Sequence, residues 1–575
     1  MAWFDEAIFY HIYPLGMLGA PTQNDYSEPV HRLKELDKWI DHLKGLGVNA
    51  IYIGPLFQSV GHGYETTDYK LLDSRLGDND DLKAFVKNCH DNSIRVIFDG
   101  VFNHTGRDFF AFKDIQNNRE GSRYRDWYCN VNFGGNNEYN DGFSYDNWGG
   151  YNLLAKLNQR NPEVRDYICD VIRFWVDEFD VDGIRLDAAD VLDFEFMKAL
   201  RGVANTVKPE FWLMGEVIHG DYTRWVNEGT LHSVTNYTLH KALYSGHNDH
   251  NYFEIAHTVK RLYEMGGNRP DGLKLYNFSD NHDVERIITK LNNKANYAPV
   301  HILMYTLPGV PSIYYGSEFG IEGKKEKFSD ASLRPCLKYE DYKDALENNT
   351  CTQLIARLGE ARSVAKMLSY GDYREAVLTN RQYAFVRSWN GQSAIIAVNN
   401  DEGPATVYVN GVPDGTYHGA ISGRTYTVQG GNVQIDIPAN YGDILLPDGM
   451  EDTFEALEKV EAPVEKPEAP VEKPEAPVEK VESPVEKVEA TVEKISAPTG
   501  KPGAGVKYNI DSKYDAYDPD VIKSRTDYDS MTVEELQVAI LEKMSGNGNV
   551  DQQMIRTVMD NVYLDSLRNW VNSFR

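Results

Sequence analysis

Cysteine is scarce in this sequence. Only five occur in 575 residues, at Cys89, Cys129, Cys169, Cys336 and Cys351. Their number is odd, and no two of them have the CxxC spacing of a thiolate metal site or a redox motif. We therefore expect neither a framework of structural disulfides nor a metal bound by cysteines. Stability has to come from an apolar core instead, and a chain of this length can bury a large one.

Long apolar runs and an excess of basic residues are also lacking. No stretch of about 18 apolar residues occurs, so we expect no membrane span. The formal net charge of −28 at pH 7 disfavours binding to nucleic acid or to an anionic membrane. A neutral ligand such as a sugar is more compatible with this net charge. The first residues, MAWFDEAIFYHIYP, contain acids where a signal peptide has basic residues, so the sequence as written predicts a cytoplasmic protein.

Short β-branched or aromatic runs alternate with amphipathic stretches through the first part of the chain. The runs lie at 8–14, 50–54, 95–103, 181–188, 211–217, 233–239, 274–283 and 312–318. Two of the stretches between them, 31–47 and 79–93, have apolar residues at i, i+3, i+4 and i+7, which is typical of helices with one buried face. Eight strands alternating with helices predict a parallel α/β sheet that closes into a (β/α)8 TIM barrel over residues 1–368.

Other segments depart from this pattern. After the third predicted strand, a long connection rich in Gly, Asn, Asp, Tyr and Trp predicts an inserted domain at 104–160. Residues 369–449 alternate short strands with Gly, Asn and Asp, which is typical of an antiparallel β-sandwich. Residues 450–505 contain a proline-punctuated repeat rich in Glu, Lys, Ala and Val, which predicts a disordered linker.

The tail at 506–575 has helix signals of its own. Thr532 to Glu535 resembles a capping box, and Leu536, Ile540 and Leu541 follow at helical spacing. We expect a small helical module that is tethered to the enzyme and binds another protein or a surface. Simple self-packing of its apolar residues is the alternative.

Polar residues at the carboxyl ends of the predicted strands are the candidates for catalysis, because the active site of such a barrel forms at that end. They are Asp99, Asn103 and His104 in the third strand, Arg185 and Asp187 in the fourth, Glu216 in the fifth, and His282 and Asp283 in the seventh. Carboxylates, imidazoles and a guanidinium should therefore converge on one pocket.

Such a pocket fits the cleavage of glycosides. This reaction needs a carboxylic acid to protonate the leaving oxygen and a carboxylate to meet the oxocarbenium-like centre. Arg185 stands two positions before Asp187 and faces the same side of the strand, so we expect it to keep Asp187 ionised as a nucleophile. Glu216 follows apolar residues, which favour the protonated form that a general acid needs.

Several motifs resemble those of the α-amylase family (glycoside hydrolase family 13). They are DGVFNH at 99–104, DGIRLDAAD at 182–190, GEV at 215–217 and FSDNHD at 278–283, in this order, with HGYETTDY at 62–69 and GVPSIYYGSE at 309–318. ETTDYKLLDSRLGDNDDLK and DAADVLDFEFMKALR resemble the neopullulanase and cyclomaltodextrinase branch in particular. The resemblance covers residues 1 to 449.

The resemblance implies a retaining hydrolase that cleaves α-1,4-glucosidic bonds of starch-derived oligosaccharides or cyclodextrins through a covalent glycosyl-enzyme intermediate. It implies that Asp187 is the nucleophile, Glu216 the acid/base, and Asp283 the third carboxylate, which grips sugar hydroxyls. Tyr64 would stack under the sugar at the cleavage point. The further substrate-binding residues would be Asp99, His104, Arg185 and His282.

The sequence also departs from the family. The Lys-His pair that many α-amylases carry after the nucleophile is replaced by Asp190 and Val191, and the aromatic residue expected after Val217 is Ile218. Because Val191 stands where a Ca2+-ligating histidine would be, we expect no required metal and no other cofactor, and a structural hydrogen bond for Asn103. A Ca2+ ion elsewhere stays open.

Some residues and functions have two interpretations. His219 and His62 could contact sugar or lie on the surface, and Trp148, Tyr145 and Trp225 could stack on sugar or pack in the core. For the protein as a whole, an α-glucan transglycosylase would use the same two carboxylates with a sugar acceptor. A catalytically silent glucan-binding or scaffold protein is the other alternative, although such proteins lose one or more of the three acids, which are all present here.

Overall fold

The computed structural model describes residues 2–267, 272–327 and 329–450, together with Phe454, Leu457, Leu536, Gln537 and Ile540. The chain divides into two compact units, Met1–Ala469 and Pro470–Arg575. The predicted linker at 450–505 and the predicted helical module at 506–575 lie outside the described residues, apart from the few positions just named. Within the described part, no helix has both the length and the apolar character needed to cross a bilayer.

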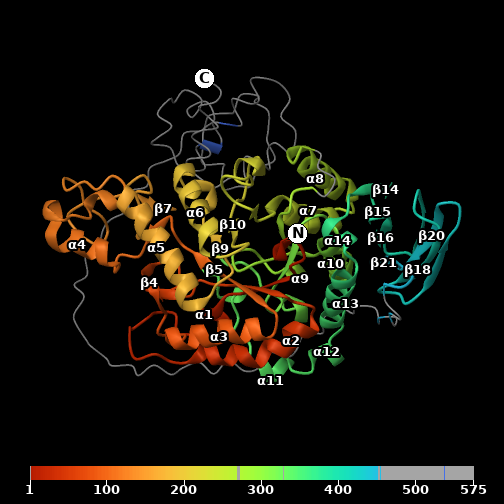
Figure 1. The fold of residues 1–575 in the computed structure, drawn as a ribbon, viewed down its shortest axis with the longest axis horizontal. Helices are drawn as coiled ribbons and strands as arrows, with labels where there is room; N and C mark the ends of the chain where they lie inside the picture. The colour runs from red at the N-terminus through yellow and green to blue at the C-terminus, as the bar shows by residue number, and fades with distance from the viewer. Residues whose placement is uncertain are drawn as a thin grey trace, which may run out of the picture. The chain divides into compact units, whose positions relative to one another are not determined.

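Eight parallel strands form the centre of the first unit (Figure 1). In barrel order they are β1 (Phe9–Ile12), β2 (Ala50–Ile53), β5 (Arg95–Gly100), β9 (Gly183–Leu186), β10 (Trp212–Gly215), β11 (Ser233–Val234), β12 (Tyr276–Phe278) and β13 (Val310–Tyr314). β13 pairs with β1, and a parallel bridge between Thr235 and Tyr276 joins β11 to β12 and closes the ring. All eight predicted strands are present, and the (β/α)8 barrel is confirmed.

Helices connect these strands or follow the last of them. They are α1 (Pro14–Met17), α2 (Ile40–Gly45), α3 (Asn79–Asp91), α5 (Pro162–Phe179), α6 (Phe194–Val207), α7 (Tyr237–Asn248), α8 (Tyr252–Met265), α9 (Ile287–Lys290), α10 (Tyr297–Thr306), α11 (Tyr339–Tyr342), α12 (Ala345–Asn348), α13 (Thr350–Val364) and α14 (Met367–Tyr370). α3 begins with a capping box at Asp78, and α5 begins with Asn161 as N-cap and Pro162 in the first turn.

The helix predicted at 31–47 is present, but its first part is not an α-helix. Its first part, Arg32–Trp39, is a 3-10 helix, and α2 continues it. A 3-10 helix has three residues per turn, so Leu33, Leu36 and Trp39 lie on one face, and all three are buried.

Two small sheets lie on the side of the barrel where its strands end. β3 (Phe57–Ser59) and β4 (Thr66–Leu72) form a hairpin after β2. The inserted segment contains α4 (Phe110–Asn118) and a three-stranded sheet in the order β6 (His104–Thr105), β8 (Tyr151–Lys156), β7 (Asn147–Trp148). Phe112, Phe143 and Tyr145 are buried against one another in this segment. The segment therefore has a small aromatic core of its own.

The C-terminal β domain consists of two packed antiparallel sheets. One has six strands in the order β14 (Arg374–Leu378), β15 (Gln382–Trp389), β16 (Gln392–Asn399), β21 (Tyr441–Pro447), β18 (Gly415–Gly419), β19 (Thr425–Val428), and the other pairs β17 (Ala405–Asn410) with β20 (Asn432–Ile437). Val386 and Ile395 of the first sheet share a buried cluster with Val407 and Ile435 of the second. This is the predicted sandwich.

The chain just after β21 packs against other parts of the first unit. Phe454 is buried, and the guanidinium of Arg357 in α13 lies 5.1 Å from the centre of its ring. The backbone N–H of Leu457 donates to the carbonyl of Ile421, between β18 and β19, at 2.9 Å. The catalytic body therefore extends a few residues beyond the predicted boundary at 449.

Candidate active site

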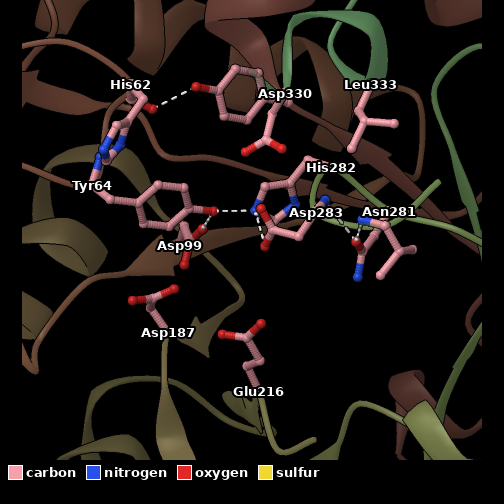
Figure 2. A network of polar contacts seen from close by, with 12 residues as sticks. His62, Tyr64, Asp99, Asp187, Glu216, Asn281, His282, Asp283, Asp330 and Leu333 are labelled. Carbon is pink, nitrogen blue, oxygen red and sulfur yellow. Dashed lines mark hydrogen bonds and ion pairs between the residues drawn. The ribbon is translucent and has the colours of Figure 1, made fainter. Parts of the chain in front are cut away.

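A cavity of about 290 Å³ lies at the carboxyl ends of the barrel strands. Its lining residues are His62, Tyr64, His104, Trp148, Leu154, Asp187, Ala188, Asp190, Glu216, Ile218, Asp283, Asp330 and Arg334. The three predicted catalytic acids thus face the same space, and Figure 2 shows Asp187 and Glu216 across from Tyr64 and Asp283. Three predicted sugar contacts, Asp99, Arg185 and His282, do not line the cavity and are buried. His219 is exposed and does not line it either.

The guanidinium of Arg185 joins the carboxylates of three neighbouring strand ends. Its Nη1 lies 2.8 Å from Asp99 Oδ1 and 2.8 Å from Asp187 Oδ1, and its Nη2 lies 2.8 Å from Glu216 Oε2. The side chain is almost wholly buried. Because parallel strands in register end side by side, residues far apart in the chain meet on this one cation.

The single positive charge of Arg185 cannot neutralise three carboxylates. Burial raises the pKa of Asp187 well above its usual value; Arg185 opposes this, while the charges of Glu216 and Asp99 add to it. Arg185 acts to lower the pKa of Asp187, as expected, but it is shared with Asp99 and Glu216.

The backbone directly after Asp187 contacts Glu216. The N–H of Ala188 donates to Glu216 Oε2 at 3.1 Å, and Ala188 itself is in the left-handed region, with φ of 45°. The hydroxyl of Tyr237 lies 3.4 Å from the other carboxylate oxygen, and Asn281 Nδ2 donates to that hydroxyl at 3.1 Å. Glu216 is therefore held by Ala188 and Tyr237, and Asn281 positions the hydroxyl of Tyr237.

Asp283 contacts a histidine and an arginine. Its Oδ2 lies 3.1 Å from His282 Nε2, and its Oδ1 accepts from Arg334 Nη2 at 2.9 Å. Withdrawal from bulk water acts to raise the pKa of Asp283, but His282, Arg334 and Arg185 outweigh it and hold the pKa below the usual value. Asp283 is therefore a stable carboxylate that can accept hydrogen bonds from hydroxyl groups.

Tyr64 forms one wall of the cavity. Its hydroxyl lies 2.5 Å from His282 Nε2 and 3.1 Å from Asp99 Oδ2 (Figure 2). Asp99 also accepts from the hydroxyl of Tyr52 at 2.8 Å. Burial raises the pKa of Tyr64 well above its usual value, so the phenol stays neutral. Asp99 and His282 thus orient an aromatic ring that a sugar can stack on.

His104 and Asn103 make hydrogen bonds within the protein. His104 Nε2 lies 3.1 Å from the carbonyl of Tyr64, and burial lowers the pKa of His104 to about 3, so the ring is neutral. Asn103 Oδ1 accepts from Gln159 Nε2 at 3.2 Å, and the Asn103 carbonyl accepts from the N–H of Leu157. In the described part of the chain, the acids and histidines close enough to share a metal are His31, Asp78 and Asp81, which do not line the cavity.

The aromatic candidates separate into two groups. Trp148 lines the cavity, whereas Tyr145 and Trp225 are buried in the core. Sequence reasoning missed Arg334 and Asp330, which lie on a loop after the last barrel strand. No strand end or motif marks either residue, so the sequence offered no signal for them.

Comparisons with known proteins agree with this geometry. Residues 32–365 match the family model described as alpha amylase, catalytic domain. A cyclomaltodextrinase of Thermoanaerobacter pseudethanolicus is 34% identical over 436 residues, which are 71% of this chain and 73% of the relative. The intracellular maltogenic amylase of Bacillus subtilis is 32% identical over 323 residues, 56% of this chain and 53% of the relative.

The fold comparison gives the same family. A solved structure of a cyclomaltodextrinase superposes with a TM-score of 0.67 at 26% sequence identity, covering 77% of this chain and 78% of that one. The predicted resemblance to this branch is therefore confirmed. With the family model matching more than half of the sequence, the chain belongs to the alpha-amylase family of glycoside hydrolases.

Proposed function

We propose that this protein hydrolyses α-1,4-glucosidic bonds of maltooligosaccharides or cyclodextrins with retention of the anomeric configuration. The observation that carries the proposal is the shared contact of Asp187 and Glu216 with one guanidinium, at a cavity that Asp283 also lines. Two carboxyl groups held so close favour the retaining geometry, with a separation of about 5–5.5 Å, over the wider inverting one. The relatives named cyclomaltodextrinase and maltogenic amylase support the substrate class.

In this mechanism Glu216 protonates the leaving oxygen while Asp187 attacks the anomeric carbon and forms a glycosyl-enzyme. Glu216 then takes a proton from the water that hydrolyses this intermediate. Arg185 contacts both acids and can stay bound as charge moves from one to the other. Asp283 accepts hydrogen bonds from the sugar hydroxyls, and Tyr64 stacks on the ring.

We also propose that catalysis needs no metal. The hydrogen bond from Gln159 to Asn103, together with an apolar side chain at Val191, supports this. A cytoplasmic location is supported by the relative named as intracellular. The binding of a partner protein or surface by the predicted module at 506–575 stays a proposal from sequence.

The test is product analysis with maltoheptaose, β-cyclodextrin and pullulan, combined with NMR of fresh product. We expect short maltooligosaccharides and the α-anomer first. Appearance of the β-anomer first would refute retention. Products longer than the substrate would favour the transglycosylase, and no turnover of any of these glucans would favour the silent alternative.

A further inference from the structure

Tyr237 lies behind the general acid, in the first turn of α7. Asn236 caps this helix, and its side-chain oxygen accepts from the backbone N–H of Leu239 at 3.1 Å. The ring of Tyr237 packs edge-on against the ring of Phe278 in β12, with the ring centres 4.9 Å apart. Tyr237 does not line the active-site cavity. These contacts hold its hydroxyl on the far side of Glu216, 3.4 Å from Oε1.

The two carboxyl oxygens of Glu216 have different partners. Oε2 lies 2.8 Å from Nη2 of Arg185 and accepts from the backbone N–H of Ala188 at 3.1 Å. Both partners are donors that cannot accept a hydrogen bond, so a proton on Oε2 would have to displace one of them. Oε1 faces the hydroxyl of Tyr237, which can both donate and accept. The proton that the general acid delivers is therefore carried by Oε1.

Asn281 determines the direction in which the hydroxyl of Tyr237 points. Its Oδ1 accepts from the backbone N–H of Asp283 at 2.8 Å and of Val284 at 3.2 Å, so its Nδ2 faces Tyr237 (Figure 2). This Nδ2 donates to the phenolic oxygen at 3.1 Å. Because that oxygen serves as an acceptor, the phenolic hydrogen is free to point at Oε1 of Glu216. Burial and the charge of Glu216 raise the pKa of Tyr237 well above its usual value, so the phenol keeps this hydrogen.

We infer that Tyr237 is a positioning residue for the general acid, which donates to Oε1 of Glu216 and stabilises the carboxylate that forms as the proton leaves. The inference rests on the proposed function. In the first step, the proton moves from Oε1 to the glycosidic oxygen, the bond from that oxygen to the anomeric carbon breaks, and Asp187 bonds to that carbon.

The contact between Tyr237 and Glu216 should strengthen during this step. Hydrogen bonds to an ionised acceptor are stronger than those to a neutral one, so the phenol favours the transition state over the bound substrate. The separation of 3.4 Å is long for a hydrogen bond, as catalytic contacts often are before the substrate binds.

The test compares two substrates that depend differently on the acid: maltotriose, which has a sugar as leaving group, and an aryl α-maltoside, whose leaving group is activated. In Tyr237→Phe, we expect kcat/KM for maltotriose to fall about 10- to 100-fold, and kcat/KM for the aryl substrate to change less than about threefold. A merely structural role would lower both values together.

The pH profile gives a second measurement on the same variant. The basic limb of kcat/KM for maltotriose should move to higher pH in Tyr237→Phe, because the carboxylate form of Glu216 loses a donor. The other charged groups that act on Glu216 are Arg185, Asp187 and Asp190, and they are the same in both enzymes.

Tyr244→Phe is the matched control, because it removes a phenolic oxygen from the same helix at a residue that does not line the cavity. It should keep the wild-type values for both substrates. Asn281→Asp retains the acceptor for the two backbone N–H groups, but its carboxylate draws the phenolic hydrogen away from Glu216. The selective loss on maltotriose should recur, and the addition of Tyr237→Phe should lower kcat/KM little further.

Equal losses on both substrates in Tyr237→Phe, or no loss on either, would overturn the inference and leave the proposed function intact. If the wild-type enzyme cleaves neither substrate, the proposed function itself is wrong and the inference falls with it.

Discussion

Nη2 of Arg334 lies 2.9 Å from Oδ1 of Asp283, although 51 positions separate the two residues in the chain. The same nitrogen contacts Asp330 at 3.1 Å, and Arg334 Nε donates to the carbonyl of His282 at 3.0 Å. Arg334 therefore stabilises the ionised form of Asp283 and holds the loop that carries this residue in place.

Arg334→Met should lower kcat/KM about 10- to 100-fold, since a hydrogen bond to a charged group contributes about 1.5–3 kcal/mol. It should also move the acid limb of the pH profile upward. The pKa of Asp283 is depressed in the native enzyme, and without this cation the carboxylate takes up a proton at a higher pH. Arg334→Lys keeps the charge and should shift the limb less. Equal acid limbs in all three enzymes would contradict this role.

Asp187→Asn and Glu216→Gln should each reduce turnover about 10⁴-fold or more while the protein stays folded. Both changes remove the reacting charge or proton at nearly constant shape. Azide distinguishes the two roles. It should restore cleavage of an aryl α-maltoside by Glu216→Ala, with the α-glycosyl azide as product, because the activated leaving group needs no acid and azide attacks the glycosyl-enzyme without a general base. In Asp187→Ala, azide should instead displace the leaving group directly and give the β-glycosyl azide. Residual activity close to that of the wild type in either variant would refute the assignment, and circular dichroism checks the fold.

Chelation of metals should leave activity intact. The side-chain oxygen of Asn103 is engaged by Gln159, and Val191 offers no ligand atom. Turnover is to be measured after dialysis against EDTA, and again after Ca2+ is added back. Complete loss of activity in EDTA that Ca2+ reverses would show that a required metal site exists.

Asp182→Asn should lower the free energy of unfolding at pH 7 by about 2 kcal/mol. Burial alone would raise the pKa of Asp182, but His90, Lys208 and the N–H of Val96 hold it at about 2, below the usual 3.8. A depressed carboxyl pKa stabilises the native state fully above the unfolded pKa, and this stabilisation is lost as the pH falls toward about 2.

The difference between wild type and Asp182→Asn should therefore narrow below pH 4, as measured by urea unfolding. Asp166→Asn is the control, because this carboxylate is 68% exposed and pairs with its neighbour Arg165 at the surface. A constant difference between pH 3 and pH 7 would show that charge is not the cause.

Truncation after Leu457 should leave the turnover of a soluble maltooligosaccharide unchanged and should weaken any binding that depends on the tail. Truncation at Gly449 removes Phe454 as well, and burial of a phenylalanine contributes about 1.5–3 kcal/mol, so this shorter chain should unfold at a lower temperature. Loss of most activity in the chain that ends at Leu457 would mean that the tail belongs to the catalytic body.

The barrel and its principal acids could be predicted from sequence because both depend on local pattern. Each strand is a short apolar run with turns around it, and the carboxyl end of every parallel strand points to the same face. Asp187, Glu216 and Asp283 are among the candidates that this rule selects, and the family resemblance supplies their roles. The aromatic core of the inserted segment has no such periodicity, so only its length and composition could be recognised.

The features of the site that could not be predicted from sequence depend on contacts between segments that are far apart in the chain. Arg334 reaches Asp283 from a loop whose path no periodic pattern fixes. The sharing of Arg185 among three carboxylates depends on the register of β5, β9 and β10, which is set by the ring closure rather than by any one strand. The positions of Asp99 and His282 also depend on how the strands come together. Both residues are buried and contact Tyr64, which lines the cavity, but they do not line it themselves.

The left-handed turn at Ala188 places a main-chain donor against Glu216. The N–H that reaches Glu216 is donated from that backbone conformation, and a side chain other than glycine in it costs on the order of 1 kcal/mol. A glycine here would relieve the strain but loosen the turn, and a β-branched residue would strain it further. The identity of residue 188 therefore acts on Glu216 through the main chain, since its side chain decides how readily the backbone adopts the turn whose N–H holds this carboxylate.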